Sequence, residues 1–270
     1  MYSVQKANKT FEPYSEEKVI DSIRRAHIHH SIQGKVLAHV NNKMYDGITT
    51  REIYHHITEF LGDTGDHYAK ARYSLKEAIM NLGPTGYPFE DFISKLLQEE
   101  GYHTKVRQVL RGECITHEID VIAEKGGKSA MIEAKYHNSP GIRSQVHVAL
   151  YTQARFVDIK NKNHIDEAWI ITNTKTTTEV NAYAQCKNMK AISWSYPEGN
   201  SLRDMIERLR LYPVTMLSSL SSGHKRILLN NHIVLCKEIY KDNSLIKTLY
   251  LSENDYKNVI AEVNFVCKQG

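Results

Sequence analysis

Two β-prone segments joined by a glycine-rich turn constrain the fold of this chain more than any other feature. Residues 118–123 and 129–135 alternate or run apolar, as half-buried strands do, and the residues between them include two consecutive glycines. They therefore predict a β-hairpin. Asp120 lies on its first strand, whereas Glu133 and Lys135 lie two apart on the second and point to the same face. Folding the hairpin brings Asp120 near Glu133 and Lys135.

These three residues form a D…ExK pattern with a chemistry of its own. Two carboxylates can hold Mg²⁺, and a neighbouring ammonium can position or help to deprotonate a water molecule for attack on phosphorus. This is the chemistry of phosphodiester hydrolysis. The pattern is short, and charged residues on the open face of a hairpin also occur by chance in many proteins. The order of the surrounding elements decides between the two interpretations.

The sequence around the hairpin predicts alternating helices and strands. Residues 89–99 carry apolar side chains at helical spacing, and Gly101 ends that helix. Residues 104–110 predict a strand before the hairpin. After the hairpin we expect a helix, a strand, a helix and a strand, at residues 141–158, 168–172, 178–189 and 191–195.

This order of elements resembles the α/β/α core of the restriction-endonuclease-like PD-(D/E)xK nucleases. The phrase Phe-Glu-Asp-Phe-Ile-Ser-Lys-Leu-Leu-Gln-Glu-Glu-Gly-Tyr at 89–102 is most similar to their Mrr-type branch. The resemblance spans residues 87–196 and implies a mixed sheet, a DNA substrate and Mg²⁺ or Mn²⁺ as the metal. Ile119 departs from the family, which usually has a proline before its first aspartate.

The resemblance also implies a role for each matching residue. Asp120 and Glu133 would be metal ligands, with the backbone carbonyl of Ala134 as a third. Lys135 would orient the attacking water and stabilise charge in the transition state. Glu90 matches a carboxylate that many members use as an extra metal ligand, although an acid in the first turn of a helix is also favoured by the helix dipole.

Polar residues after the ExK strand are further candidates. Gln145 and Gln153 lie where relatives often carry a polar active-site residue, and we take Gln153 as the catalytic candidate. Arg143 and Arg155, expected on the same helix, would contact phosphate or only solvate the helix surface. His137 would contact phosphate or be a polar residue where the strand ends.

A second pattern opens the chain. Val4 and Lys6 stand two apart in a predicted strand, a Glu-Pro-Tyr-Ser run follows at 12–15, and Lys18 comes three residues later. Helices are predicted at 18–29, from a capping box that begins at 49, and at 68–81. Residues 2–82 thereby resemble the ATP-cone, the nucleotide-binding regulatory domain of ribonucleotide reductases and of their repressor. A lysine-rich segment can also be only a solvated face, but these spacings all agree with the family.

The ATP-cone resemblance implies ATP or dATP as an effector and a homo-oligomer, because in that family nucleotide binding changes subunit contacts. Lys6 and Lys18 would supply the positive charge that a triphosphate needs. Val4 would line the slot for the base. The expected cofactor-binding residues are Val4, Lys6, Glu12, Ser15, Lys18, Thr50 and Tyr54.

Turn residues divide the chain into three predicted domains. A Gly-Pro-Thr-Gly-Tyr-Pro stretch at 83–88 separates an ATP-cone at 1–83 from a nuclease domain at 87–196. Residues 200–270 predict a small helical module, which resembles a helix-hairpin-helix reader of the DNA backbone as much as a plain packing module. The fold class is therefore a multidomain α+β and α/β chain, with a mainly helical N-terminal domain and a central α/β/α core.

Composition agrees with these interpretations without deciding between them. A length of 270 residues suits two or three domains, and a net charge of +4 is too small to identify a nucleic-acid partner. The four cysteines form no CxxC pair, which argues against a zinc knuckle or a disulfide framework. No run of about 18 apolar residues and no signal-peptide pattern is present, so we expect a cytoplasmic protein without a membrane segment.

The sequence thus predicts a metal-dependent DNA endonuclease that is governed by ATP or dATP. Three alternatives remain open. The core could be catalytically silent and serve as a nucleotide-responsive DNA-binding regulator, or it could be a structure-specific repair or junction nuclease that reads DNA shape. The chain could also be a regulatory subunit of nucleotide metabolism that uses only its first domain.

Overall fold

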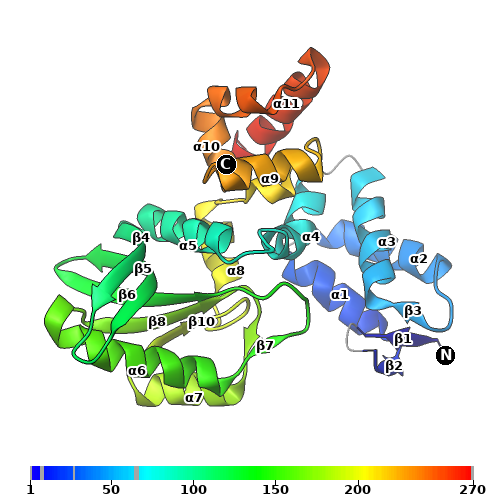
Figure 1. Cartoon of the computed structure of the whole chain (residues 1–270). Coiled ribbons are helices and arrows are strands. Elements are labelled where there is room, and N and C mark those ends of the chain that lie inside the picture. The colour runs from blue at the N-terminus through cyan, green and yellow to red at the C-terminus, as the bar shows by residue number, and fades with distance from the viewer. Residues whose placement is uncertain (1, 7–8, 27, 64–66, 269–270) are drawn as a thin grey trace. The chain divides into compact units, whose positions relative to one another are not determined.

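The computed structural model describes residues 2–6, 9–26, 28–63 and 67–268 (Figure 1). The chain forms two compact units, Met1–Glu77 and Ala78–Gly270. Within the described part of the chain, no helix combines the length and the apolar character needed to span a bilayer.

In its described residues, the first unit contains a small sheet and helices α1 to α4, the last of which continues into the second unit. Its strands are β1 (Ser3–Gln5), β2 (Phe11–Pro13) and β3 (Ile48–Thr49), in the order β2-β1-β3. Strand β1 pairs antiparallel with β2 and parallel with β3. The helices are α1 (Glu16–Arg25), α2 (His30–Asn42), α3 (Thr50–Asp63) and α4 (His67–Met80).

Two boundaries in this unit differ from the sequence prediction. The helix expected at 18–29 begins at Glu16, because the Ser15 hydroxyl caps it, and ends at Arg25. His29 instead caps α2, where its Nδ1 accepts a hydrogen bond from the Ser31 N–H. The predicted capping box is confirmed, since the Glu52 carboxylate accepts from the Thr49 N–H at 2.9 Å and the Thr49 hydroxyl accepts from the Glu52 N–H at 3.1 Å.

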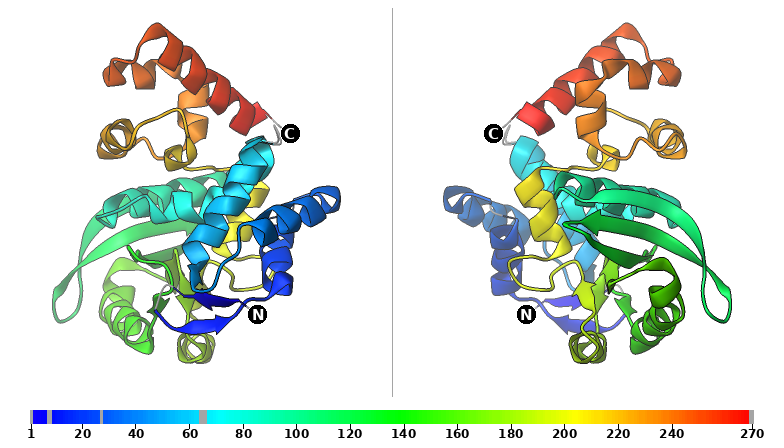
Figure 2. Two further views of the ribbon diagram at one scale, coloured as in Figure 1. Left: turned by 90° about the vertical axis from the view of Figure 1, so that its right-hand side faces the viewer. Right: turned by 90° about the vertical axis from the view of Figure 1, so that its left-hand side faces the viewer.

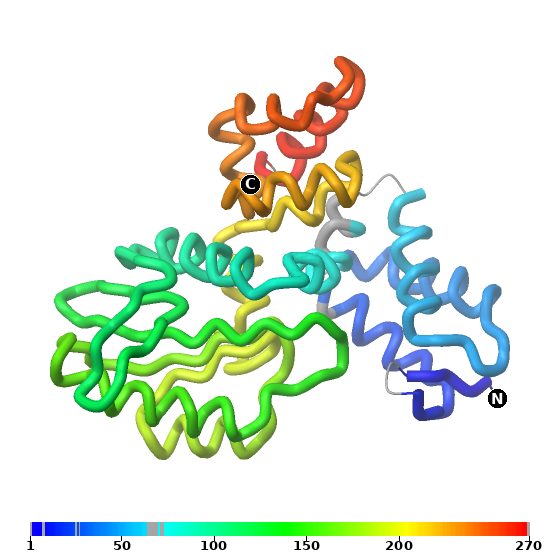
Figure 3. Tube along the Cα trace, viewed as in Figure 1, coloured from blue at the N-terminus to red at the C-terminus, as the bar shows by residue number. Residues whose placement is uncertain are grey.

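The second unit is built on a five-stranded sheet of order β10-β8-β6-β5-β4, and this sheet is mixed, as the sequence predicts. Its antiparallel part joins β4, β5 and β6, and its parallel part joins β6, β8 and β10. The tube in Figure 3 follows the β5–β6 hairpin out and back, and the turn uses Gly126 and Gly127 at φ 60° and 77°. The strands are β4 (His103–Arg111), β5 (Thr116–Lys125), β6 (Lys128–Lys135), β8 (Glu167–Thr172) and β10 (Lys190–Ile192).

Helices cover both faces of this sheet (Figure 2). One face packs on α5 (Tyr87–Glu99), and the other packs on α6 (Val146–Asn163) and α7 (Thr178–Cys186). The α6 and α7 side of the core includes Ile122, Met131 and Ile170 from the sheet. This three-layer plan, with one apolar core on each side of the sheet, is the α/β/α architecture that the sequence predicts.

Helix α6 begins and ends five residues later than predicted. Residues before it are extended, because β7 (Arg143–Ser144) pairs in parallel with β9 (Lys175–Thr176). Arg143 therefore lies on a short strand and not on the helix with Arg155. Two further predictions are too long by a few residues: α7 ends at Cys186, before Asn188 at φ 54°, and the last strand ends at Ile192.

The residues after the sheet are helical, as predicted for 200–270. Within this stretch we use the name C-terminal module for residues 212–268, which follow α8 (Leu202–Leu209). The Glu262 carboxylate on the last helix accepts hydrogen bonds from the backbone and hydroxyl groups of Ser218 and Ser219. The elements of the module are η1 (Val214–Met216), α9 (Ser222–Asn230), α10 (Cys236–Lys241), η2 (Asn243–Leu249) and α11 (Glu253–Lys268).

A carboxylate on α6 fixes the turn between β4 and β5. Asp158 accepts hydrogen bonds from Cys114 N at 2.8 Å and Ile115 N at 3.3 Å, and from His117 Nε2 at 2.8 Å. These bonds, the one from Cys114 N foremost, hold the pKa of Asp158 well below its usual range. Gly112 permits this close approach, since a Cβ there would lie 2.0 Å from Asp158 Oδ2 and 2.8 Å from the Ile115 carbonyl oxygen.

Gly112 therefore tests how firmly α6 is attached to the hairpin. We expect Gly112→Ala to lower the free energy of unfolding by about 1–3 kcal/mol, because the methyl group must displace a carboxylate held by three hydrogen bonds. Urea denaturation measures the change. The same substitution in an Asp158→Ala background should have a smaller effect, and an equal effect in both backgrounds would contradict the steric explanation.

Candidate active site

The β5–β6 hairpin brings the D…ExK residues together, as predicted. Val121 pairs with Ile132, so the next position in this antiparallel register places Asp120 beside Glu133. Asp120 Oδ2 accepts a hydrogen bond from the Ala134 N–H at 2.8 Å. Burial raises the pKa of Asp120, and burial together with the charge of Asp120 raises the pKa of Glu133. Two carboxylates therefore share a site where negative charge is costly.

Lys135 ends β6 with its side chain half-buried. Within the part of the chain that the structure describes, its ammonium makes no ion pair. Close to two carboxylates, an ammonium without a protein partner is suited to bind a water molecule or a phosphate oxygen. His137, unlike Lys135, has protein partners. Its ring Nε2 is hydrogen-bonded to Ser144 Oγ at 2.9 Å, and its backbone N–H donates to Asn173 Oδ1 at 2.9 Å. These bonds fit a polar residue that anchors the end of the strand.

Arg155 on α6 is a member of this site. Its side chain is buried, at 7% exposure, and Nη1 donates a short hydrogen bond to Glu133 Oε2. The guanidinium also lies 5.2 Å from the centre of the Tyr151 ring. In the described structure Arg155 Nε is buried without a hydrogen-bond partner. The sequence suggested phosphate binding or solvation for Arg155, whereas in the structure it is the partner of the half-buried Glu133.

The two glutamine candidates occupy different positions. Gln145 is exposed and precedes α6 as its N-cap residue, so it does not lie on the helix where it was expected. Gln153 lies on α6, and its Oε1 is buried with no hydrogen-bond partner among the described residues. Buried polar atoms are nearly always satisfied in proteins, so an unpaired one marks a place where a ligand or water binds. Gln153 remains the predicted catalytic glutamine.

Glu90 lies in the first turn of α5, only 8% exposed. Burial and the charge of Asp120 raise its pKa to about 7, so the carboxyl group stands in the electric field of the D…ExK site. Arg107 Nη1 on β4 donates to Glu90 Oε2 at 3.2 Å, and Arg107 Nη2 donates to Asp91 Oδ1 at 2.8 Å. Arg107 and Asp91 were not predicted as site residues, because a charged residue in a strand or helix is usually solvated.

The donor set of this site fits a divalent cation of the Mg²⁺ type. Its carboxylates are hard oxygen donors whose mutual repulsion a cation would relieve. Among the described residues, no three His, Cys, Asp or Glu side chains converge closely enough to hold a metal by themselves. A cation held by Asp120 and Glu133 would therefore need the Ala134 carbonyl and water to complete its coordination.

The residues predicted to bind nucleotide gather in the first unit. Glu12 Oε2 on β2 lies 2.5 Å from Lys6 Nζ and 3.0 Å from Lys18 Nζ, and hydrogen bonds from Lys6 and then Lys18 lower the pKa of Glu12. Val4 is buried on β1 opposite Glu12. Thr50 is exposed and begins α3, directly after Thr49, which pairs with Gln5 at the end of the β1–β3 ladder.

Ser15 and Tyr54, two of the residues predicted to contact nucleotide, interact with other residues of the first unit. The Ser15 hydroxyl accepts a hydrogen bond from the Lys18 N–H at 3.3 Å as the N-cap of α1. The Tyr54 ring stacks on Tyr73 at 5.2 Å between centroids, and burial raises the pKa of Tyr54.

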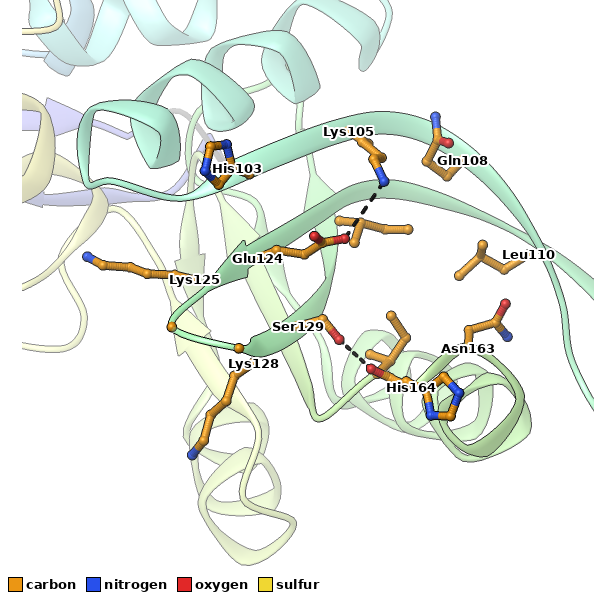
Figure 4. Close-up of a pocket in the computed structure, with 14 residues that line it drawn as sticks. His103, Lys105, Gln108, Leu110, Glu124, Lys125, Lys128, Ser129, Asn163 and His164 are labelled. Atoms are coloured by element: carbon orange, nitrogen blue, oxygen red, sulfur yellow. Dashed lines mark hydrogen bonds and ion pairs between the residues drawn. The ribbon is translucent and has the colours of Figure 1, made fainter.

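A pocket of about 560 Å³ lies along β4 and the tip of the β5–β6 hairpin (Figure 4). It opens between β4, the hairpin tip and the end of α6, and Lys105, Lys128 and His164 line it. Lys105 Nζ lies 3.8 Å from Glu124 Oε1, so part of its positive charge is offset within the pocket. None of the D…ExK residues lines it, so this pocket is separate from the candidate active site.

Comparison with known proteins agrees with this arrangement. A family model described as restriction endonuclease matches residues 84–198, and one described as AF1548-like, C-terminal, matches residues 212–267. An uncharacterized protein of Archaeoglobus fulgidus is 35% identical over 175 residues, which cover 64% of this chain and 99% of that protein. This chain belongs to the AF1548-like family.

A solved structure supports the same assignment. The crystal structure of the protein of unknown function AF1548 matches with a TM-score of 0.60 and 33% identity, and the match covers 68% of this chain and all of that one. The family model that matches residues 84–198 supports the predicted restriction-endonuclease-like core. Neither family model reaches residues 1–83, so the ATP-cone stays a prediction.

Glu90 predicts a pH dependence of stability. Its folded-state pKa of about 7 lies above its ordinary value of 4.5, so its contribution to stability is present below about pH 4.5 and is lost as the pH rises through 7. In EDTA, we expect Glu90→Gln to raise the free energy of unfolding by about 1–3 kcal/mol at pH 8 and to change it little at pH 5. Urea unfolding at both pH values measures this.

Glu124→Gln is the matched control, because it removes the same charge from an exposed position. It should change stability little at either pH. A Glu90→Gln effect that is equal at pH 5 and pH 8 would show that the carboxyl group is not protonated preferentially in the folded state.

Proposed function

We propose that this protein is a metal-dependent DNA endonuclease whose nuclease core is controlled by ATP or dATP bound to residues 1–83. The observation that carries the first part is the half-buried Asp120–Glu133 pair beside Lys135, which makes no ion pair among the described residues, in a core that matches the restriction-endonuclease family. Nuclease cores of this type generally use Mg²⁺ or Mn²⁺ and act on DNA.

In the proposed reaction, Asp120, Glu133 and the Ala134 carbonyl would hold the cation, which when bound would supply polarisation of the scissile phosphate and activation of water. Lys135 orients that water and stabilises negative charge as the phosphodiester bond breaks. Arg155 keeps Glu133 in place and offsets its charge. Gln153 offers an unpaired oxygen on the same helix as Arg155.

Plasmid cleavage in Mg²⁺ or Mn²⁺ tests this function. We expect Asp120→Asn and Lys135→Ala each to lower the cleavage rate by about 100-fold or more, because each removes a group that acts on the reacting phosphate. Lys128→Ala is the matched control, since Lys128 is an exposed lysine at the other end of the same strand.

The outcomes separate the nuclease from its alternatives. Equal cleavage by all variants would mean that Asp120 and Lys135 are not the catalytic groups. DNA binding without cleavage in any cation would favour the regulator. Cleavage confined to branched or damaged DNA would favour the repair or junction nuclease.

The nucleotide-binding part of the proposal is supported by the Lys6–Glu12–Lys18 cluster. Glu12 holds two ammonium groups together at one edge of the small sheet, beside the buried Val4. A triphosphate would replace Glu12 as the partner of these lysines and leave Glu12 to accept hydrogen bonds from the sugar or base. The domain would use nucleotide as an effector that changes subunit contacts in a homo-oligomer.

Isothermal titration of the full chain with ATP and dATP measures this binding. We expect Lys6→Met and Lys18→Met each to weaken it by about 10-fold or more, the loss of one charged hydrogen bond to phosphate. Lys35→Met on α2, an exposed lysine, is the control. No binding by the wild type would remove the ATP-cone from the proposal, and sedimentation with and without nucleotide would show whether subunit contacts change.

A further inference from the structure

Helix α5 joins the candidate active site to the C-terminal module. Asp91, Lys95 and Glu99 recur every fourth residue, so they form one stripe along the helix. Each member of the stripe makes a hydrogen bond to the module near the start of α10. Asp91 Oδ2 accepts from His232 Nδ1 at 2.7 Å, and Glu99 Oε2 accepts from Lys237 Nζ at 2.7 Å. Lys95 Nζ donates to the His232 carbonyl oxygen at 2.6 Å and to the Glu238 carboxylate.

Asp91 uses its two oxygens on two different elements. Oδ2 accepts from His232 Nδ1 in the module, and Oδ1 accepts from Arg107 Nη2 on β4 at 2.8 Å. Asp91 is only 6% exposed, so these two bonds are what satisfy its buried carboxylate. Arg107 in turn donates to Glu90, which stands in the field of Asp120. A continuous path of hydrogen bonds therefore runs from His232 to Glu90.

Arg107, the middle residue of this path, has an unusual backbone conformation with a positive φ. Its φ is 52° in the middle of β4, where the ladder pairs Val106 with Val121 and Gln108 with Ile119. This register places Arg107 across from Asp120, the position that the ladder skips. A left-handed conformation of a residue other than glycine costs roughly 1–2 kcal/mol and persists only where its surroundings impose it. The ion pairs with Glu90 and Asp91 are the contacts that can impose it here.

We propose that the C-terminal module is a positioning element for the metal site: His232 holds Asp91, Asp91 holds Arg107, and Arg107, which lies across from Asp120 in the β4–β5 register, holds Glu90. This inference rests on the proposed nuclease function. His232 is then a positioning residue, which acts on the metal site through three side chains and touches neither metal nor substrate. Its side chain is 66% exposed, so its removal leaves no cavity in the core.

Mn²⁺ binding by the full chain, measured by electron paramagnetic resonance, is the first readout. We expect His232→Ala to weaken Mn²⁺ binding by about 10-fold, the lower end of the effect of losing a group that orients a metal site indirectly. In plasmid cleavage, the Mn²⁺ concentration for half-maximal rate should rise by the same factor, with little change in the rate at saturating Mn²⁺. His232→Asn keeps a donor on a short side chain and should restore part of the affinity.

Lys237→Ala is the matched control. It breaks another bond between the module and α5, but Lys237 reaches Glu99 and has no bond to Asp91 or Arg107 in the described structure. It should leave Mn²⁺ binding unchanged. Equal effects of His232→Ala and Lys237→Ala would mean that the module only stabilises α5, and unchanged Mn²⁺ binding in His232→Ala would overturn the path.

The two proposals fail in different ways. A wild-type chain that binds Mn²⁺ but cuts no DNA contradicts the nuclease function, while the His232→Ala comparison still decides the positioning role. A wild-type chain that binds no Mn²⁺ overturns both.

Discussion

The nuclease-like core depends on the burial of carboxylates whose charges must be compensated. Removing an ionised carboxylate from water is expensive unless hydrogen bonds or an opposite charge replace the lost hydration. Here the compensation comes from three directions: the Ala134 N–H for Asp120, Arg155 for Glu133, and Arg107 for Glu90. These groups lie on β6, α6 and β4, so the site exists only when sheet and helices are assembled. The site therefore forms only in the folded core, and the folded core is stable only because these partners compensate the carboxylates.

The parts of the fold that the sequence predicts are those set by local patterns. Period-two alternation and two adjacent glycines define the β5–β6 hairpin, and that hairpin alone brings Asp120 to Glu133 and Lys135. Short elements were missed for the same reason. Helix α2 buries only Val36 and Val40, and β3 has two residues, so neither has enough pattern to be detected. The shift of α6 has a different cause, since the β7–β9 pair that delays it depends on partners far apart in the chain.

The partners of the two arginines in the site, Arg155 and Arg107, could not be predicted from the sequence. Arg155 was noticed on its helix, but its partner is fixed by how α6 crosses the sheet, which spacing does not reveal. Arg107 was overlooked, although a signal was present. A tight connection that starts at Gly112 pairs Arg111 with Thr116, and counting back along that register places Arg107 across from Asp120. The positive φ of Arg107 could not be foreseen, because it accompanies ion pairs to Glu90 and Asp91 on the preceding helix, and residue spacing does not reveal those pairs.

Helix α6 performs two tasks three residues apart. Arg155 reaches Glu133, and Asp158 holds the turn that leads into the strand of Asp120. Three residues advance a helix by about 300°, so the two side chains lie about 60° apart around its axis and serve neighbouring parts of one hairpin. Inserting or deleting a single residue between them would rotate one partner by about 100° and detach it. The interval from 155 to 158 is thus fixed in length, whereas the exposed hairpin tip at Gly126 and Gly127 is a suitable place to lengthen the chain, attach a label or join a second protein.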